Sequence, residues 1–537
     1  MTSRPARSWS LAIFVAVFSL YLVTSSREPA WGDARGMWEV ANRLVGERTI
    51  AIDVRWPEDI PPGRGGKYYG ITPIGTSLVH LPGVVIARAV HGLDPRHDAL
   101  ARPLATHLAP AALGALACVL LFLLLCDLGI RVRTASACAA ILACATTTWV
   151  YARMPYSEIL QLTCFLGLFR QVLRVAAEPA PRDAIWLGVW AGCLFNAKYV
   201  FASAIIGGGV VLIWTYRHRR AELRRVLAWA TVGGAPLLGL ALAYNYLRWG
   251  SITQTGYEPY LEMYFGGSVF DGAWGMLLSP NKSVFLYSPP LVLALLGLPA
   301  AVRAVPRLGF AMLAMVAPVF LIYCTYRSWS GDYAWGPRFI VWAIPVLLIP
   351  LAWFLERATT RWRQGVVIGV VALGVAVQVL GAALYWDHFI RVAIETKNQW
   401  LGNPNRAGAY IPAKGRPHCD SCFEDTYELL WTPAFQPIHG HWWLVRSLAR
   451  GDAAQSAQQH APWRRYTTLD VDLSSTYPRA RIDWWGLLWI KDAPHTRTAG
   501  LALLVLLVTG LALGVWRWLR LHRGARALEG DSAGDSA

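Results

Sequence analysis

Long apolar runs recur along this chain, and short polar turns separate them. A helix needs about 20 consecutive, mostly apolar residues to cross the hydrocarbon core of a membrane. Twelve runs approach this length, and they cover residues 10–25, 103–126, 134–152, 157–174, 184–197, 199–216, 227–248, 283–302, 308–326, 338–355, 365–386 and 497–517. The pattern therefore predicts an all-α polytopic membrane protein with about twelve transmembrane helices.

Basic residues gather in alternate turns between these runs. Examples are Arg4 and Arg7 before the first run, Arg131 and Arg133 after the second, and Arg357, Arg361 and Arg363 before the eleventh. Turns on the cytoplasmic side of a membrane are enriched in Lys and Arg. We therefore expect an integral protein of the inner (plasma) membrane with both termini in the cytoplasm and the intervening turns outside.

The first run has a second interpretation as a cleaved signal peptide, because its apolar stretch is short. The residues that follow it, Ser25 to Pro29, contain no small-x-small cleavage site. The sequence therefore favours a membrane anchor.

The polar pieces expected outside are residues 27–102, the shorter loops 249–282 and 327–337, and a region at 387–496. The last piece is long enough to fold, and residues 466–474 partly alternate polar and apolar side chains, as a strand does. We expect a transmembrane domain at 1–386 that includes loop 27–102, a small α+β outer domain at 387–496, and a last helix with a cytoplasmic tail at 497–537.

The composition supports a membrane protein. Hydrophobic residues make up 55% of the chain and charged residues 15%, whereas roughly a quarter of the residues in soluble domains are charged. The 50 Lys and Arg exceed the 33 Asp and Glu and give a net charge of +17, but they stand in short clusters between apolar runs. Such spacing is typical of membrane topology. The expected partner is thus the lipid bilayer and no nucleic acid.

An amphipathic helix is predicted directly after the first run. Met37, Val40 and Leu44 recur at helical spacing on one face, and Asp33 stands at the start of the helix. An Asp in this position commonly caps a helix by accepting hydrogen bonds from its first amides. The alternative is a catalytic carboxylate at the membrane surface, and the residues alone leave both interpretations open.

A second acid, Glu158, lies at the outer end of the fourth predicted helix. An ionisable residue there is a functional candidate, although a glutamate that extends to the membrane surface or pairs with Arg153 has the same sequence pattern. Four basic residues are predicted on the same side: Lys67, Lys198, Lys282 and Arg338. Each alone is typical of a side chain that extends to the headgroups. Together with the two acids they form a candidate clamp for a lipid phosphate.

Cys419 and Cys422 stand in a polar HCDSC motif. A single C-x-x-C pair in an outer region favours a local disulfide in an oxidising compartment. A zinc site with nearby histidines is the alternative.

Several motifs together resemble the GT-C superfamily of polytopic glycosyltransferases. They are GDARGMWEVANRLV after the anchor, GGKYYGITPIGTSLVHLPGVV, YSEIL, LLSPNKSVFLYSPPL and WSGDYAWGPRFIVWAIP. More narrowly, the chain is similar over residues 9–386 to the bacterial branch related to glycosyltransferase family 39, which includes protein O-mannosyltransferases and the lipid A aminoarabinose transferase. The resemblance implies transfer of a sugar, with inversion, from a polyprenyl-phosphate carrier to an envelope acceptor on the outer face of the membrane.

The resemblance also implies roles for the candidate residues. Asp33 matches the first-loop acid, the implied general base, and Glu158 matches a second acid that orients the acceptor or a divalent cation. The implied substrate loop holds Tyr68, Tyr69 and Pro73. Relatives often carry a Lys just before this proline, where the chain has Thr72, so the cation that holds the donor phosphate stays open. Two separated carboxylates are few ligands for a metal ion, and no cofactor is assigned.

A transporter or flippase for a lipid-linked precursor is the main alternative, and a scaffold protein is another. Transporters place ionisable residues near the middle of the bilayer, often in repeated halves, whereas these candidates gather at one face. The sequence shows no P-loop, which argues against ATP-driven transport. A lipid phosphate leaves as a stable anion, so sugar transfer needs one base and cations that stabilise the developing charge. The candidate set contains both.

Overall fold

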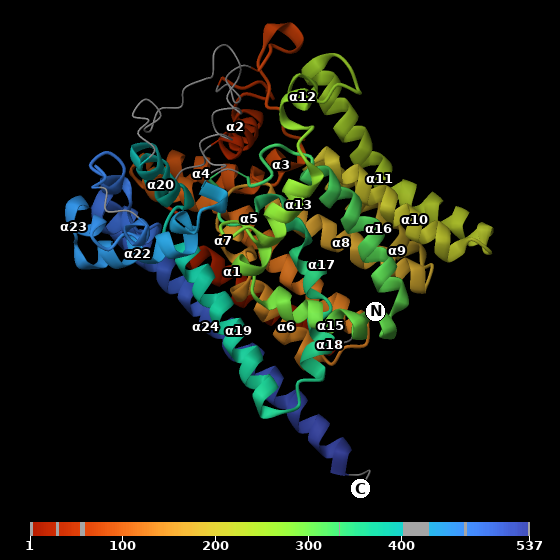
Figure 1. Cartoon of the computed structure of the whole chain (residues 1–537). Helices are drawn as coiled ribbons and strands as arrows, with labels where there is room; N and C mark the ends of the chain where they lie inside the picture. Colours follow the sequence, from red (N-terminus) through yellow and green to blue (C-terminus); the bar gives the residue numbers. More distant parts are fainter. Residues whose placement is uncertain are drawn as a thin grey trace.

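Helices dominate the computed structural model, which describes residues 4–27, 32–53, 60–331, 333–400, 429–466 and 470–534 (Figure 1). Among these residues there is no strand, and only three isolated β-bridges occur. The helices follow the apolar runs because a helix satisfies every backbone amide and carbonyl within its own segment, which hydrocarbon requires.

Within the described ranges, eight helices are long and apolar enough to cross a membrane, so the chain is an integral membrane protein. They are α1 (Arg4–Val23), α5 (Asp98–Asp127), α8 (Glu158–Ala177), α10 (Ala202–Tyr216) with its preceding turn η3 (Tyr199–Phe201), α11 (Arg220–Trp249), α16 (Pro306–Cys324), α19 (Arg361–Ala383) and α24 (Arg497–Gly534). The predicted count of twelve is not confirmed. The other four runs form helices that are shorter or interrupted: α6 (Val132–Ala145), α9 (Pro181–Ala197), α15 (Pro290–Ala304), and the series η5 (Arg338–Ala343), α17 (Ile344–Leu348) and α18 (Leu351–Glu356).

Shorter helices lie between the long ones or beyond their ends. They include α2 (Asp33–Gly46), α3 (Gly75–Leu78), α4 (Leu81–Leu93), α7 (Thr148–Ala152), α12 (Leu261–Tyr264), α13 (Val269–Leu278), α14 (Val284–Tyr287), α20 (Trp386–Trp400), α22 (Pro437–Arg450) and α23 (Ala454–Gln458).

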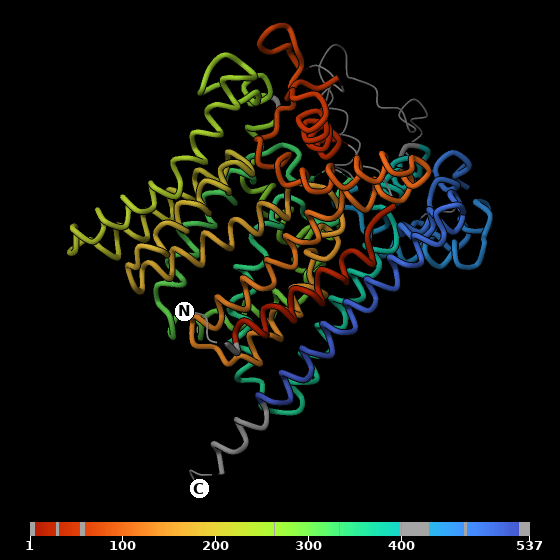
Figure 2. The backbone as a smooth tube through the Cα atoms, turned by 180° about the vertical axis from the view of Figure 1, so that it is seen from behind, coloured from red at the N-terminus to blue at the C-terminus, as the bar shows by residue number. Residues whose placement is uncertain are grey.

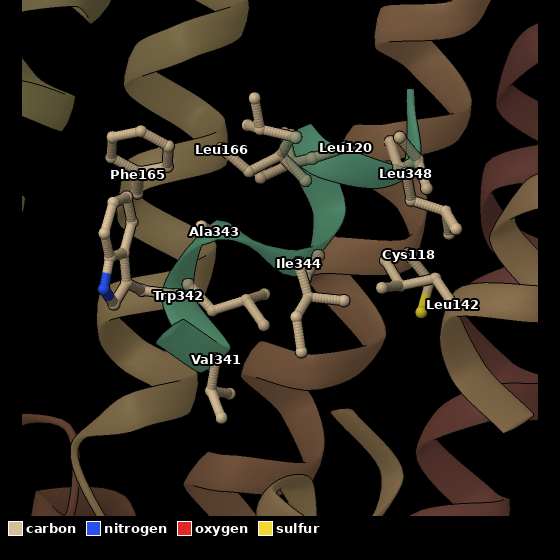
Figure 3. Close-up of a cluster of buried hydrophobic side chains, with 14 of the residues drawn as sticks. Cys118, Leu120, Leu142, Phe165, Leu166, Val341, Trp342, Ala343, Ile344 and Leu348 are labelled. Atoms are coloured by element: carbon tan, nitrogen blue, oxygen red, sulfur yellow. The ribbon is translucent and has the colours of Figure 1, made fainter. Parts of the chain in front are cut away.

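The series η5, α17 and α18 passes through the centre of the bundle. Trp342 of η5 meets Phe165 of α8 edge to face, with ring centroids 4.8 Å apart, and Ala343 and Ile344 are fully buried. Figure 3 shows these residues among side chains of α5, α6 and α8. Prolines interrupt the series because a proline lacks the amide that would continue the helix. Arg338 is the first residue of this series, at the start of η5.

Ion pairs mark one end of the bundle. Arg131 pairs with Glu356 at 3.1 Å, Arg170 pairs with Asp127 at 2.7 Å, and Arg174 pairs with Asp183 at 2.9 Å. These pairs bring together the ends of α5, α8 and α18 and the starts of α6 and α9. The opposite end of α8 lies about 30 Å away, since its 20 residues rise about 1.5 Å each. In Figure 1, α2 and α3 lie at that opposite end.

Helices α9 and α11 pack backbone against backbone. A Cβ atom on Gly188 would lie 1.8 Å from the carbonyl oxygen of Ala230, and one on Gly233 would lie 2.1 Å from that of Ile185. Small residues permit such close approach, which gives van der Waals contact where lipid supplies no hydrophobic driving force.

The polar segment, which we define as the described residues from Leu384 to Thr496, connects α19 to α24. It has its own hydrophobic cluster, which includes Phe389, Trp443 and Trp463. A buried ion pair fixes it to the membrane helices: Arg153, after α7, contacts Asp483 at 3.3 Å, and both side chains are fully buried. Asp483 also accepts a 2.7 Å hydrogen bond from Ser26 at the end of α1.

The predicted strand at 466–474 is absent from its described residues, 466 and 470–474. The alternation that predicted it is present, because Val471 and Leu473 are buried while Asp470 and Asp472 are exposed. However, the backbone of Asp472 pairs with the side-chain amide of Gln399, through bonds of 2.8 and 2.9 Å. The Gln399 side chain thus makes the hydrogen bonds that a neighbouring strand would otherwise make. The described part of the polar segment is helical and irregular.

We predict that Gly233→Val lowers the unfolding temperature of the detergent-purified protein, because the added side chain pushes α11 away from α9. Such overpacking costs about 1–3 kcal/mol. The matched control is Gly239→Val in the same helix, where nothing lies within 4 Å of the new Cβ. Equal unfolding temperatures for the two variants would contradict the close packing.

Candidate active site

The guanidinium of Arg338 lies between the carboxylates of Asp33 and Glu158. Its Nε donates to Glu158 Oε1 at 2.5 Å, and its Nη2 donates to Asp33 Oδ2 at 3.3 Å. Each residue is the first of its element: Asp33 of α2, Glu158 of α8 and Arg338 of η5. The positive end of a helix dipole favours the two acids there. Three distant parts of the sequence therefore meet in one charged group.

Asp33 does not cap α2. The N-cap position belongs to Gly32, whose φ of 54° suits glycine and which makes no side-chain bond. The Gly32 carbonyl accepts from the amide of Arg35 at 3.1 Å. The capping interpretation of Asp33 is therefore wrong. The Asp33 side chain is 35% exposed and remains accessible to a ligand.

Glu158, in contrast, is buried, with 3% of its side chain exposed. Within the described residues, Arg338 is its partner through Oε1, while Oε2 has none. The alternative pairing with Arg153 is wrong, because Arg153 pairs with Asp483. A buried carboxylate oxygen without a partner costs free energy, so it is a candidate contact for a bound molecule.

Lys198 contributes a second cation to the same group. It stands between α9 and η3. Its Nζ lies 5.5 Å from the ring centre of Phe339, next to Arg338. Burial, and then Arg338, lower the pKa of Lys198, while Glu158 and Asp33 act in the opposite direction. Among the described residues no ion pair of Lys198 is found, so its ammonium is available to an anion.

Tyrosines surround the charged group. The Tyr156 ring lies 5.3 Å from Arg338 Cζ, and its hydroxyl lies 3.3 Å from that of Tyr385. Burial raises the pKa of Tyr156 to about 12, and burial and the charge of Asp33 raise the pKa of Tyr257. Both are therefore neutral hydroxyl groups at physiological pH. The buried Tyr323 hydroxyl has no partner among the described residues.

The sequence prediction missed these tyrosines. Tyr156 stands two residues before Glu158, which is a weak signal, and Tyr257 and Tyr323 belong to a loop and a helix with no distinguishing pattern.

Other candidates lie outside the contacts of this group. Lys282 is buried, and its Nζ donates to the carbonyls of Ala334 at 2.6 Å and Gly336 at 3.3 Å. It thereby holds the loop that leads to Arg338. The Lys67 side chain is exposed, and no contact joins it to the charged group within the described part of the chain.

The predicted substrate-loop residues Tyr68, Tyr69 and Pro73 make packing contacts and hydrogen bonds with neighbouring residues. Tyr69 is buried, meets Trp249 edge to face, and donates to the Arg64 carbonyl at 3.1 Å. Tyr68 packs at the edge of two small hydrophobic clusters. The Pro73 carbonyl accepts the hydroxyl of Thr76 at 2.7 Å. Cys419 and Cys422 lie outside the described residues, so their predicted disulfide stays a prediction.

The space between the two acids holds a side-chain cation. The guanidinium of Arg338 already lies between them. In the described ranges, no group of three or more His, Cys, Asp or Glu side chains is arranged to hold a metal ion.

No protein-family model matches the chain, and no curated protein matches it. Among solved structures, it is similar to ArnT from Cupriavidus metallidurans bound to undecaprenyl phosphate, with 15% identity and a TM-score of 0.48 over 82% of this chain and 78% of that one. It is also similar to the Archaeoglobus fulgidus oligosaccharyltransferase in complex with zinc and sulfate, with 12% identity and a TM-score of 0.47 over 76% and 58% of the chains.

A third similar structure is the archaeal oligosaccharyltransferase AglB from Archaeoglobus fulgidus with an inhibitory peptide and a dolichol-phosphate, with 12% identity and a TM-score of 0.45 over 87% and 61% of the chains.

We predict that Arg338→Met destabilises the protein by about 3–5 kcal/mol, because it leaves the Glu158 carboxylate buried without its cation. The double variant Arg338→Met/Glu158→Gln should recover a large part of this loss, since it removes both charges. Thermal unfolding in detergent measures both effects. If the double variant is less stable than Arg338→Met, the pair does not have this role.

Proposed function

We propose that this chain is an inverting glycosyltransferase that moves a sugar from a polyprenyl-phosphate carrier to an envelope acceptor. The observation that carries this proposal is the charged group itself. A partly exposed carboxylate, Asp33, and an ammonium without an anionic partner, Lys198, flank the guanidinium of Arg338. One base and two cations are the groups that this reaction needs.

The cations bind the donor phosphate in this proposal. Arg338 presents a planar fork that suits phosphate oxygens, and Lys198 adds a point charge. The aromatic rings of Phe339 and Tyr323 lie 5.5 and 5.8 Å from the Lys198 ammonium, and limit the water around it. Negative charge that develops on the leaving phosphate is stabilised most where water is sparse. Lys67 remains a second candidate, on the loop that precedes Tyr68.

Asp33 acts as the base. The acceptor oxygen attacks the anomeric carbon of the sugar while its proton passes to the Asp33 carboxylate. The bond from that carbon to the phosphate oxygen breaks, and its electron pair stays on the polyprenyl phosphate. Attack from the face opposite the leaving group inverts the anomeric configuration. Binding of the donor phosphate to Arg338 weakens the bond from Arg338 to Asp33, which frees the carboxylate to accept the proton.

Glu158 positions the other groups. Its Oε1 fixes Arg338 at 2.5 Å. Its buried Oε2 and the Tyr323 hydroxyl, both without a partner among the described residues, are candidate contacts for hydroxyl groups of the sugar or the acceptor.

The site faces the outside of the cell in this proposal. Arginines stand in the turn between α5 and α6 and at the start of α6 (Arg131 and Arg133), and in the turn between α18 and α19 and at the start of α19 (Arg357, Arg361 and Arg363). These turns lie at the end of the bundle away from α2. Cytoplasmic turns are enriched in such residues, so α2 and the polar segment lie on the outer side. The charged group lies at one end of the bundle and not near its middle, which favours an enzyme over a transporter or flippase.

We predict that Asp33→Asn lowers sugar transfer by about 10²–10⁴-fold, because the amide cannot take the acceptor proton. The assay compares envelope glycans and lipids of a deletion strain complemented with wild type or variant, followed by transfer assays in membranes. The matched control is Asp53→Asn, which changes an exposed carboxylate that pairs with Arg43. Full transfer by Asp33→Asn at equal abundance would reject the mechanism.

We also predict that Lys198→Ala weakens binding of undecaprenyl phosphate about tenfold, since it removes one charged hydrogen-bond donor. Titration of the detergent-purified protein with this lipid measures the change. The control Lys491→Ala removes an exposed lysine of the polar segment. A parallel Lys67→Ala variant tests the second candidate cation. Unaltered affinity of Lys198→Ala would remove this residue from the phosphate site.

A further inference from the structure

The polar segment contains a cavity that the proposed reaction does not use. Its volume is about 230 Å³, and it is bounded by α22 and by the turn η8 (Pro462–Arg465). The charged and titratable side chains in its wall are His439, Arg446, Arg450, Asp452, His460 and Arg465. One carboxylate therefore faces three guanidinium groups and two imidazoles.

The three arginines form no ion pair with the described residues. Among the described residues, no ion pair involves Arg446, Arg450 or Arg465, although the adjacent Arg464 pairs with Asp470. Three cations held around one cavity repel one another, and a bound anion relieves this repulsion. Unpaired arginines in a concave site are suited to phosphate oxygens, which they bind through two parallel hydrogen bonds.

The arrangement follows from the sequence of α22. His439, Trp442, Arg446 and Arg450 are spaced by three, four and four residues, so they lie on one face of the helix. Arg465 comes from η8 and completes the cavity on the other side. Burial and then the charge of Arg465 lower the pKa of His439, which is consistent with a positive potential in the cavity.

The cavity lies apart from the Arg338 group. On a different face of α22, His441 is buried, and its ring centre lies 4.4 Å from that of Trp335, in the loop before Arg338. Helix α22 therefore separates the two sites.

The cavity also lies near the ends of the membrane helices. The amide of Asp483 donates to the carbonyl of Ala383, the last residue of α19, at 2.8 Å, and α22 packs against α19. Figures 1 and 2 show α22 beside the upper ends of α19 and α24. Trp442, in the cavity wall, is 54% exposed, and tryptophan is enriched where a protein meets lipid headgroups.

We propose that this cavity is a binding site for a phosphate group, carried either by a lipid headgroup or by a soluble molecule. Arg446 and Arg465 grip the phosphate from opposite walls, and Arg450 adds charge. The site is additional to the proposed glycosyl transfer and does not depend on it.

The test is a titration of the full-length protein in neutral detergent at constant ionic strength. The probes are inorganic phosphate, dihexanoyl phosphatidic acid, and dihexanoyl phosphatidylcholine as a lipid without a free phosphate monoester. The test variant is Arg446→Gln/Arg465→Gln. The control is Arg479→Gln, which removes an exposed arginine of the same segment that does not line the cavity. We expect binding to the double variant to be weaker by about tenfold or more, and binding to the control to match wild type.

Binding of phosphatidic acid well above inorganic phosphate supports a headgroup as the source, and similar binding of both supports a soluble phosphate. Absence of binding to either probe, or equal affinities of the wild type and the double variant, would overturn the proposal. Arg446→Gln/Arg465→Gln should keep sugar transfer at the wild-type level, so loss of transfer and loss of phosphate binding in this cavity can be distinguished. Unfolding temperatures close to wild type confirm that the exposed substitutions leave the fold intact.

Discussion

The organisation of the site depends on one constraint: a mostly buried guanidinium must be neutralised where water is scarce. Arg338 satisfies it by contacting Glu158 and Asp33 together. Because each of the three residues begins a different element, the pairing fixes the starts of α2, α8 and η5 relative to one another. A buried ion pair of this kind adds little to net stability, but removal of one partner is costly. The ion pairs therefore fix the relative positions of these three elements but add little to the free energy of folding.

A second buried ion pair fixes the position of the polar segment relative to the membrane helices. Arg153 and Asp483 join the turn after α7 to the chain that leads into α24, and Asp483 also accepts bonds from Ser26 and the amide of Arg27. The polar segment is thus attached to the membrane helices at a point where three stretches of chain meet. Through Trp335 and His441 it also contacts the loop before Arg338.

The sequence predicted most of the helical architecture because apolar length is a strong local signal. It predicted that Asp33 and Glu158 would lie on one side together with four basic residues, Lys67, Lys198, Lys282 and Arg338. The structure brings Arg338 and Lys198 to the two acids, but not Lys67 or Lys282. The sequence did not show which of these charged residues pair with one another. Whether Glu158 pairs with Arg153 or Arg338 depends on packing between helices 180 residues apart in sequence. The cap of α2 depends on the backbone of Gly32, and the extended residues 470–474 lack a neighbouring strand because a glutamine side chain takes its place.

The separation in sequence between Glu158 and its cation has a consequence for biogenesis. Synthesis runs from the N-terminus, so α8 enters the membrane long before Arg338 has been made. The acid is tolerable during this interval because it is the first residue of its helix, within reach of interfacial water. The segment that contains Arg338 (η5, α17 and α18) is interrupted by prolines and enclosed by α5, α6 and α8. It therefore packs between helices that were synthesised before it. Insertion of this segment therefore assembles the group of Asp33, Glu158 and Arg338, and a chain that has not yet inserted it leaves Glu158 without its cation.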